Sequence, residues 1–126
     1  METVYEWLLH NTEDEGNYFT ILNTKRHTEG QGSPYLDVMV RTKDFTVVNL
    51  NIYPKQSTDS PNLNTGRLQG RDVIQHLEFA GEQEVISYLC TGEASNPTTD
   101  SAGVVVDVLQ PVGASGSITF PPEQNT

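Results

Sequence analysis

The chain has 126 residues, of which 17 are acidic and 7 basic, so its formal net charge is −10. A domain of this size buries enough apolar surface to fold without a disulfide or a metal. The acidic excess opposes binding to nucleic acid, which depends on Lys and Arg releasing counterions from the phosphates. No apolar run is long enough to span a bilayer, and the first residues are acidic where a signal peptide is basic. The sequence therefore predicts a cytoplasmic protein without direct nucleic-acid or membrane contact.

The composition favours sheet over helix. Val, Ile and Thr together number 31, whereas Ala, the best helix former, occurs 4 times. We expect a single β-rich domain over residues 1–126, with 121–126 a flexible C-terminal tail. The fold class that we expect is mainly β, an antiparallel β-sandwich or partly open barrel of about seven strands with a short N-terminal helix.

The N-terminal segment has the only clear helix pattern. Thr3 and Glu6 match a capping box, and Val4, Trp7 and Leu8 have the i, i+3, i+4 spacing of one helix face. We expect this helix to end by Asn11. The stretch 13–16, three acids followed by a glycine, then predicts a solvated loop, and the apolar run 18–22 has the length of a strand.

The region from Pro34 to Pro54 predicts a β-hairpin, because two runs of alternating apolar residues flank Lys43 and Asp44. A two-residue loop would place asparagines opposite aliphatic side chains. A three-residue loop over 43–45 instead pairs aliphatic with aliphatic, and a slip of one residue would reverse every side chain. We therefore predict the pairs Val40 with Val48, Val38 with Leu50 and Leu36 with Ile52.

The other face of this hairpin is mixed in character. It carries Tyr35, Asp37, Met39 and Arg41 beside Val47, Asn49, Asn51 and Tyr53. Such a face is typical of a solvated or ligand-facing surface. We expect Tyr35 and Tyr53 to lie on this less buried face, where they are available to a ligand or partner.

The second half of the chain gives weaker patterns. Residues 55–70 predict a long polar loop, and loops of this length are often functional. Residues 71–79 suit a helix or a strand, and we favour a strand. Further strands are expected over 84–90, 103–109 and 117–120, with a turn at 80–83 and a loop over 91–101.

No motif in the sequence is diagnostic of catalysis or metal binding. His76 and Glu78 have the His-x-Glu order of zinc deaminases, but the Pro-Cys-x-x-Cys partner is missing. We interpret His76 as an edge or interface histidine, expect His10 and His27 in exposed segments, and interpret the lone Cys90 as a buried small apolar residue. We therefore predict no catalytic residue, no metal and no cofactor.

The charges are unevenly distributed along the chain. All seven basic residues fall within 25–71, whereas the segments 1–24 and 72–126 contain acidic residues and no basic ones. Either these blocks form separate faces that favour partner docking, or their strands interleave and the field averages out. The basic block leaves open a local site for a small anionic ligand. The candidate ligand- or partner-binding residues are Tyr35, Tyr53, Arg41, Lys43, Arg67 and Arg71.

The function that these observations favour is a non-enzymatic binding or assembly module. It would bind a protein partner, a second copy of itself or a small anionic ligand, as a viral or phage accessory protein or an inhibitor does. Two alternatives remain open at this point. One is an acidic mimic of nucleic acid that inhibits a basic partner, and the other is a small hydrolase with a carboxylate and histidine pocket.

Overall fold

Five strands and two helices make up the part of the chain that a computed structural model describes, which is residues 2–28, 34–55, 71–94 and 103–111. In chain order the elements are α1 (Glu2–His10), β1 (Thr20–His27), β2 (Tyr35–Arg41), β3 (Val47–Pro54), β4 (Arg71–Phe79), α2 (Glu82–Thr91) and β5 (Val104–Pro111).

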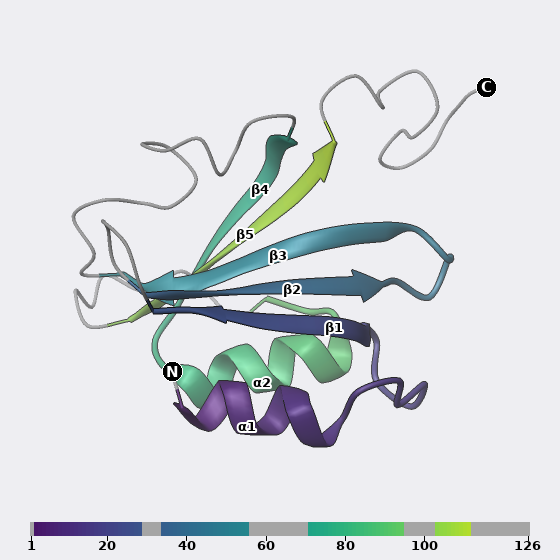
Figure 1. Cartoon of the computed structure of the whole chain (residues 1–126), viewed down its shortest axis with the longest axis horizontal. Coiled ribbons are helices and arrows are strands. Elements are labelled where there is room, and N and C mark those ends of the chain that lie inside the picture. The colour runs from purple at the N-terminus through teal and green to yellow at the C-terminus, as the bar shows by residue number, and fades with distance from the viewer. Residues whose placement is uncertain (1, 29–33, 56–70, 95–102, 112–126) are drawn as a thin grey trace.

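The strands form one open sheet in the order β1-β2-β3-β5-β4, and every neighbouring pair is antiparallel. Both helices lie against the same face of this sheet (Figure 1). The prediction of a mainly β, antiparallel fold with a short N-terminal helix is confirmed. Among the described residues the strands number five, because one predicted strand is a helix and another lies outside the described part.

The predicted hairpin is β2 and β3, and its register is the predicted one. Val40 pairs with Val48, Val38 with Leu50, and Leu36 with Ile52. All six of these side chains are almost fully buried on the face that the helices cover. The alternation of the sequence therefore determines both the loop length and the core face of this hairpin.

The main core lies between that face of the sheet and the two helices. Val4 and Leu8 of α1 and Val85, Tyr88 and Leu89 of α2 pack against it from the helix side. The predicted helix face of α1 is confirmed, because Trp7 also packs against this core. The predicted capping box is not used, since the helix begins at Glu2 and the amide of Val4 instead donates to the carboxylate of Glu82 at 2.9 Å.

The segment 84–90, which we predicted as a strand, is helical and belongs to α2. Val85, Tyr88 and Leu89 have i, i+3, i+4 spacing and all three are buried, so tertiary burial selects the helical period. Gly92 ends the helix in the left-handed conformation, with φ 78°, and its amide donates to the carbonyl of Tyr88 at 2.7 Å.

The first strand begins later than the apolar run predicts. The amides of Tyr18 and Phe19 donate to the carbonyls of Cys90 and Leu89 at 2.8 and 3.1 Å. These carbonyls belong to the last turn of α2 and have no partner within the helix. The segment before β1 is therefore held by the helix end, and β1 continues to His27, well past the predicted run.

The remaining predictions divide by position. The strands predicted at 71–79 and 103–109 are confirmed as β4 and β5, and residues 13–16 are exposed as expected. All but the first residue of the predicted loop over 55–70, most of the loop over 91–101, the strand at 117–120 and the tail at 121–126 lie outside the described residues. Within the described ranges, neither helix has the length and apolar character needed to cross a membrane.

Candidate binding surface at the hairpin end

The turn between β2 and β3 is fixed by a dense set of local hydrogen bonds. The amide of Thr42 donates to the carbonyl of Thr46 at 2.8 Å, and the amide of Phe45 donates to the carbonyl of Thr42 at 3.0 Å. The hydroxyl of Thr42 donates to the carboxylate of Asp44, which lowers the pKa of Asp44 below its ordinary value. A three-residue loop of this kind ends with a residue in the left-handed region, which is usually glycine.

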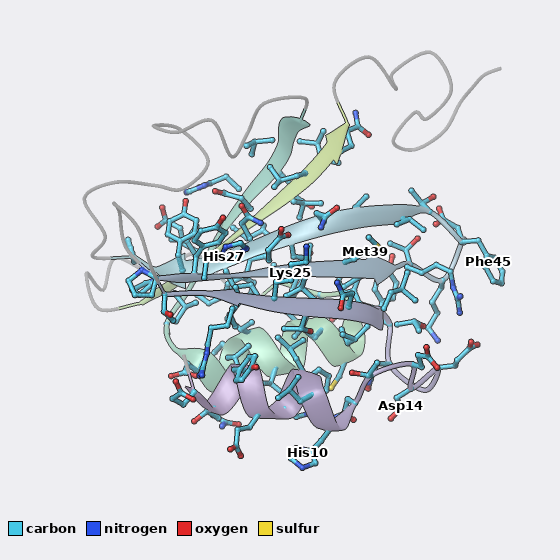
Figure 2. The ribbon with its side chains drawn as sticks, viewed as in Figure 1. His10, Asp14, Lys25, His27, Met39 and Phe45 are labelled. Atoms are coloured by element: carbon cyan, nitrogen blue, oxygen red, sulfur yellow. The ribbon has the colours of Figure 1, made fainter. Side chains whose placement is uncertain are left out.

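The residue in that left-handed position is Phe45, with φ 67°. Its side chain is 76% exposed and projects from the tip of the hairpin (Figure 2). The guanidinium carbon of Arg41 lies 5.2 Å from the centre of its ring. A bulky residue is uncommon at positive φ. A phenylalanine side chain that stays exposed to water also contributes little hydrophobic free energy to folding. The fold itself therefore does not explain this side chain.

Two other exposed apolar side chains lie on the same hairpin as Phe45. Met39 is 38% exposed and Val47 is 44% exposed, on the sheet face opposite the helices. Val47 pairs directly with Arg41 across the hairpin. We call Met39, Arg41, Lys43, Phe45 and Val47 the hairpin end. Three of the five large apolar side chains exposed in the described part belong to it, so its apolar exposure is concentrated rather than scattered.

A small hollow of about 130 Å³ lies between the hairpin end and the loop that precedes β1. Its lining is almost entirely polar, and it consists of Glu15, Asn17, Thr20, Arg41, Thr42, Lys43 and Phe45. Glu15 pairs with Arg41 at 2.8 Å between their side chains. Two of the predicted site residues, Arg41 and Lys43, therefore lie together in one site.

The other predicted site residues are elsewhere. Tyr35 and Tyr53 lie on the predicted face, but each is only 4% exposed, and they pack with Val105 in a second small core. The expectation that they occupy a less buried surface is wrong, because neighbouring strands contribute side chains that cover them. His27, which we expected in an exposed segment, stacks on Tyr35 with ring centres 4.4 Å apart.

The remaining two predicted site residues, Arg67 and Arg71, are arginines in the second half of the chain. Arg67 lies outside the described residues. Arg71 begins β4 opposite Pro111. The antiparallel register places this end of β4 at the same end of the sheet as the β2–β3 turn.

A polar network crosses the other end of the same sheet face. The hydroxyl of Tyr53 donates to Asp107 Oδ2 at 2.7 Å, and Asp107 is 2% exposed. His76 Nδ1 lies 2.5 Å from Asp107 Oδ1, while its Nε2 lies 3.3 Å from Glu78 Oε2. The interpretation of His76 as an edge histidine agrees with its position on β4, at the edge of the sheet.

This network acts as a bridge between strands rather than as a free base. Carboxylate oxygens face both ring nitrogens of His76, so neither is free for a substrate. Lys55 pairs with the second oxygen of Glu78 at 2.9 Å. The hydrogen bond from Lys55, followed by that from His76, lowers the pKa of Glu78 below its ordinary value. These contacts join β3, β5 and β4 through side chains.

The described ranges hold no cluster of three or more His, Cys, Asp or Glu side chains that could bind a metal ion. Cys90 is partly buried in α2, not in a strand as predicted. The ion pairs of Arg26 with Glu2, Arg41 with Glu15 and Lys55 with Glu78 each join the basic block to an acidic one. They favour the alternative in which the charge blocks interleave.

Two features of the structure were not predicted from the sequence. Phe45 was assigned to a turn and not considered further, although an aromatic residue in a three-residue hairpin loop is an unusual choice. Asp107 was overlooked within the apolar run 104–109, where a single charged residue in a buried strand predicts a specific partner. Comparison of the chain with protein-family models, with curated proteins and with solved structures finds no significant match.

Proposed function

We propose that the protein is a non-enzymatic protein-binding module whose recognition element is the hairpin end, with Phe45 as its central anchor. The observation that carries this proposal is the combination of positive φ and 76% exposure at Phe45. The left-handed backbone costs a non-glycine residue about 1–2 kcal/mol, and exposure forgoes the gain of burying an aromatic ring. An outlier of this kind supports a functional role for the side chain.

The composition of the hairpin end also supports a protein partner. Aromatic residues, Met and Arg are enriched at protein interfaces, and Tyr, Trp and Arg dominate their binding energy. Here Met39, Arg41 and Phe45 lie on one hairpin, and Arg41 is held between the Glu15 carboxylate and the Phe45 ring. These two contacts hold the Arg41 side chain in place before a partner binds.

The turn is rigid enough to present Phe45 in one orientation. The hydroxyl of Thr42 and the carboxylate of Asp44 both accept from the amide of Thr46, at 3.2 and 3.3 Å. Rigid presentation reduces the entropy lost when a partner orders the loop. One face of both hairpin strands is buried in the main core, so the anchor is attached to a packed part of the sheet.

The decisive variant is Phe45→Gly, because it separates recognition from stability. Glycine suits positive φ, so we expect the free energy of unfolding to stay the same or to rise by up to about 1 kcal/mol. The matched control is Leu9→Ala on α1, since Leu9 is 49% exposed and lies away from the hairpin.

The partner is to be identified with a photo-crosslinking amino acid at position 45, compared with the same group at position 9. The purified partner is then titrated with each variant by calorimetry. We expect Phe45→Gly to weaken binding by more than tenfold, the effect of an interface hot spot (roughly 2 kcal/mol), and Leu9→Ala to leave it unchanged. Equal affinity of wild type and Phe45→Gly, or unfolding of Phe45→Gly, would refute the proposal.

A further inference from the structure

The hollow beside Phe45 contains donors that the fold leaves unused. Asn17 Nδ2 is buried and has no hydrogen-bond partner among the described residues. Lys43 forms no ion pair with any described residue, although it lines the same hollow. A buried donor without a partner destabilises the folded state, so a rotation of the Asn17 side chain toward an acceptor in the hollow would be favourable.

Arg41 supplies a third donor group, and Glu15 occupies part of it. Arg41 carries five N–H donors in a planar fork, which matches the oxygens of a carboxylate or phosphate. The Glu15 side chain that it binds is 73% exposed. An exposed ion pair of this kind is weak. An external anion can therefore displace Glu15 from the Arg41 guanidinium at little cost in free energy.

The neighbouring carboxylate of Asp44 is committed to the turn. It accepts from the hydroxyl of Thr42 and from the amide of Thr46. Once Glu15 is displaced, the hollow carries the positive charges of Arg41 and Lys43 together with the Asn17 amide. In a chain with a net charge of −10, the lining of the hollow then carries two positive charges, with the Asp44 carboxylate beside it.

We propose that this hollow binds a phosphate group, held by Arg41, Lys43 and Asn17 Nδ2, with Glu15 as an internal competitor. The two basic groups match the charge of a phosphate monoester dianion, whose second pKa is about 6. The volume of about 130 Å³ is well below the roughly 300–1,000 Å³ of ordinary ligand pockets, so the phosphate itself enters and any attached group stays outside. This site needs no protein partner, and its test is independent of Phe45.

The test is a titration of the ¹⁵N-labelled chain with inorganic phosphate at constant ionic strength, followed by nuclear magnetic resonance. A second arm uses methyl phosphate, so that binding of a phosphate monoester is distinguished from binding of the free ion alone. We expect saturable shifts confined to residues 15–20 and 41–46, including the side-chain amide of Asn17.

Three variants report on the assigned roles. Lys43→Gln should weaken binding by about tenfold, as loss of one charge-assisted contact does. Glu15→Gln should strengthen it, because the competitor loses its charge. Lys25→Gln is the matched control, since Lys25 is an exposed lysine on β1, at a distance from the hollow along the sheet (Figure 2).

The outcomes that would overturn the proposal are equally specific. Shifts that do not saturate, or shifts that spread over the whole chain, would indicate general screening of charge. Equal weakening by Lys25→Gln and Lys43→Gln would show that net charge, not the hollow, governs the response. Weaker binding by Glu15→Gln would show that Glu15 supports the site instead of competing for it.

Discussion

The carboxylate of Glu82, in the first turn of α2, accepts a hydrogen bond at 2.9 Å from the backbone amide of Val4, in the first turn of α1. The two residues are 78 positions apart in the sequence. The first amides of a helix have no partner within it, and a side chain of the same segment usually supplies one. Here the second helix caps the first, so the two helices are joined by polar contact as well as by packing.

We predict that Glu82→Ala lowers the free energy of unfolding by about 0.5–2 kcal/mol, the usual cost of losing a helix cap. The control is Glu84→Ala, which removes an exposed acid from the same turn of α2. Urea denaturation of both variants measures the difference. An equal loss in the two variants would show that the charge at the start of α2, and not the contact with Val4, is what matters.

Gly92 should tolerate no side chain. Its φ of 78° disfavours any other residue, and an added Cβ would lie 2.6 Å from Cγ of Tyr18. We expect Gly92→Ala to destabilise the fold by more than the about 1–2 kcal/mol that a left-handed backbone costs. At Gly81 the backbone is extended and a Cβ meets only the Glu84 side chain at 3.3 Å. Thermal unfolding should therefore show Gly81→Ala to be the milder change, and the reverse order would contradict this account.

The hydroxyl of Tyr53 stabilises the buried carboxylate of Asp107, so Tyr53→Phe should cost about 1–3 kcal/mol although it keeps the ring. This role in stability follows from the burial of Tyr53, which we had expected on a less buried face. A double-mutant cycle with Asp107→Asn measures the coupling between the two side chains. Independent effects, additive within about 0.5 kcal/mol, would mean that the hydrogen bond contributes little.

Burial, followed by the nearby Tyr18, raises the pKa of Tyr88 from 10.0 to about 12. The unfolded chain therefore loses this proton at lower pH than the folded chain does. The stabilising contribution is complete below about pH 10 and is lost as the pH rises to about 12, by roughly 2–3 kcal/mol. We expect the wild type to lose more stability than Tyr88→Phe across this range. If the free energy of unfolding of the two proteins fell equally between pH 10 and pH 12, the raised pKa of Tyr88 would be contradicted.

The register of the β2–β3 hairpin could be predicted because the alternation of apolar residues in its sequence is compatible with a single loop length. Leu36, Val38 and Val40 must face the same side as Val48, Leu50 and Ile52, and one loop length alone achieves this. The helix α2 could not be predicted with equal ease. Its apolar residues fit both periods, and what decides between them is contact with the sheet, which a local pattern does not contain.

The candidate site was predicted in part. Arg41 and Lys43 were predicted as members of the basic block 25–71, and they line the same hollow. Tyr35 and Tyr53 were chosen because they share a mixed face, but strand neighbours far along the chain determine that they are buried. Phe45 was missed because its backbone conformation is visible only in the structure. Residue type and alternation identify a face, whereas exposure depends on the whole sheet.

The position of β5 determines the order in which the sheet can be completed. β5 is the last described strand in the sequence, yet it lies between β3 and β4 and pairs with both. Among the described strands, β4 has no other neighbour. During synthesis β1, β2 and β3 can pair as soon as they emerge, whereas β4 must wait for β5 with its backbone unpaired. Residues 104–111 are therefore required before β4 can pair with the rest of the described sheet.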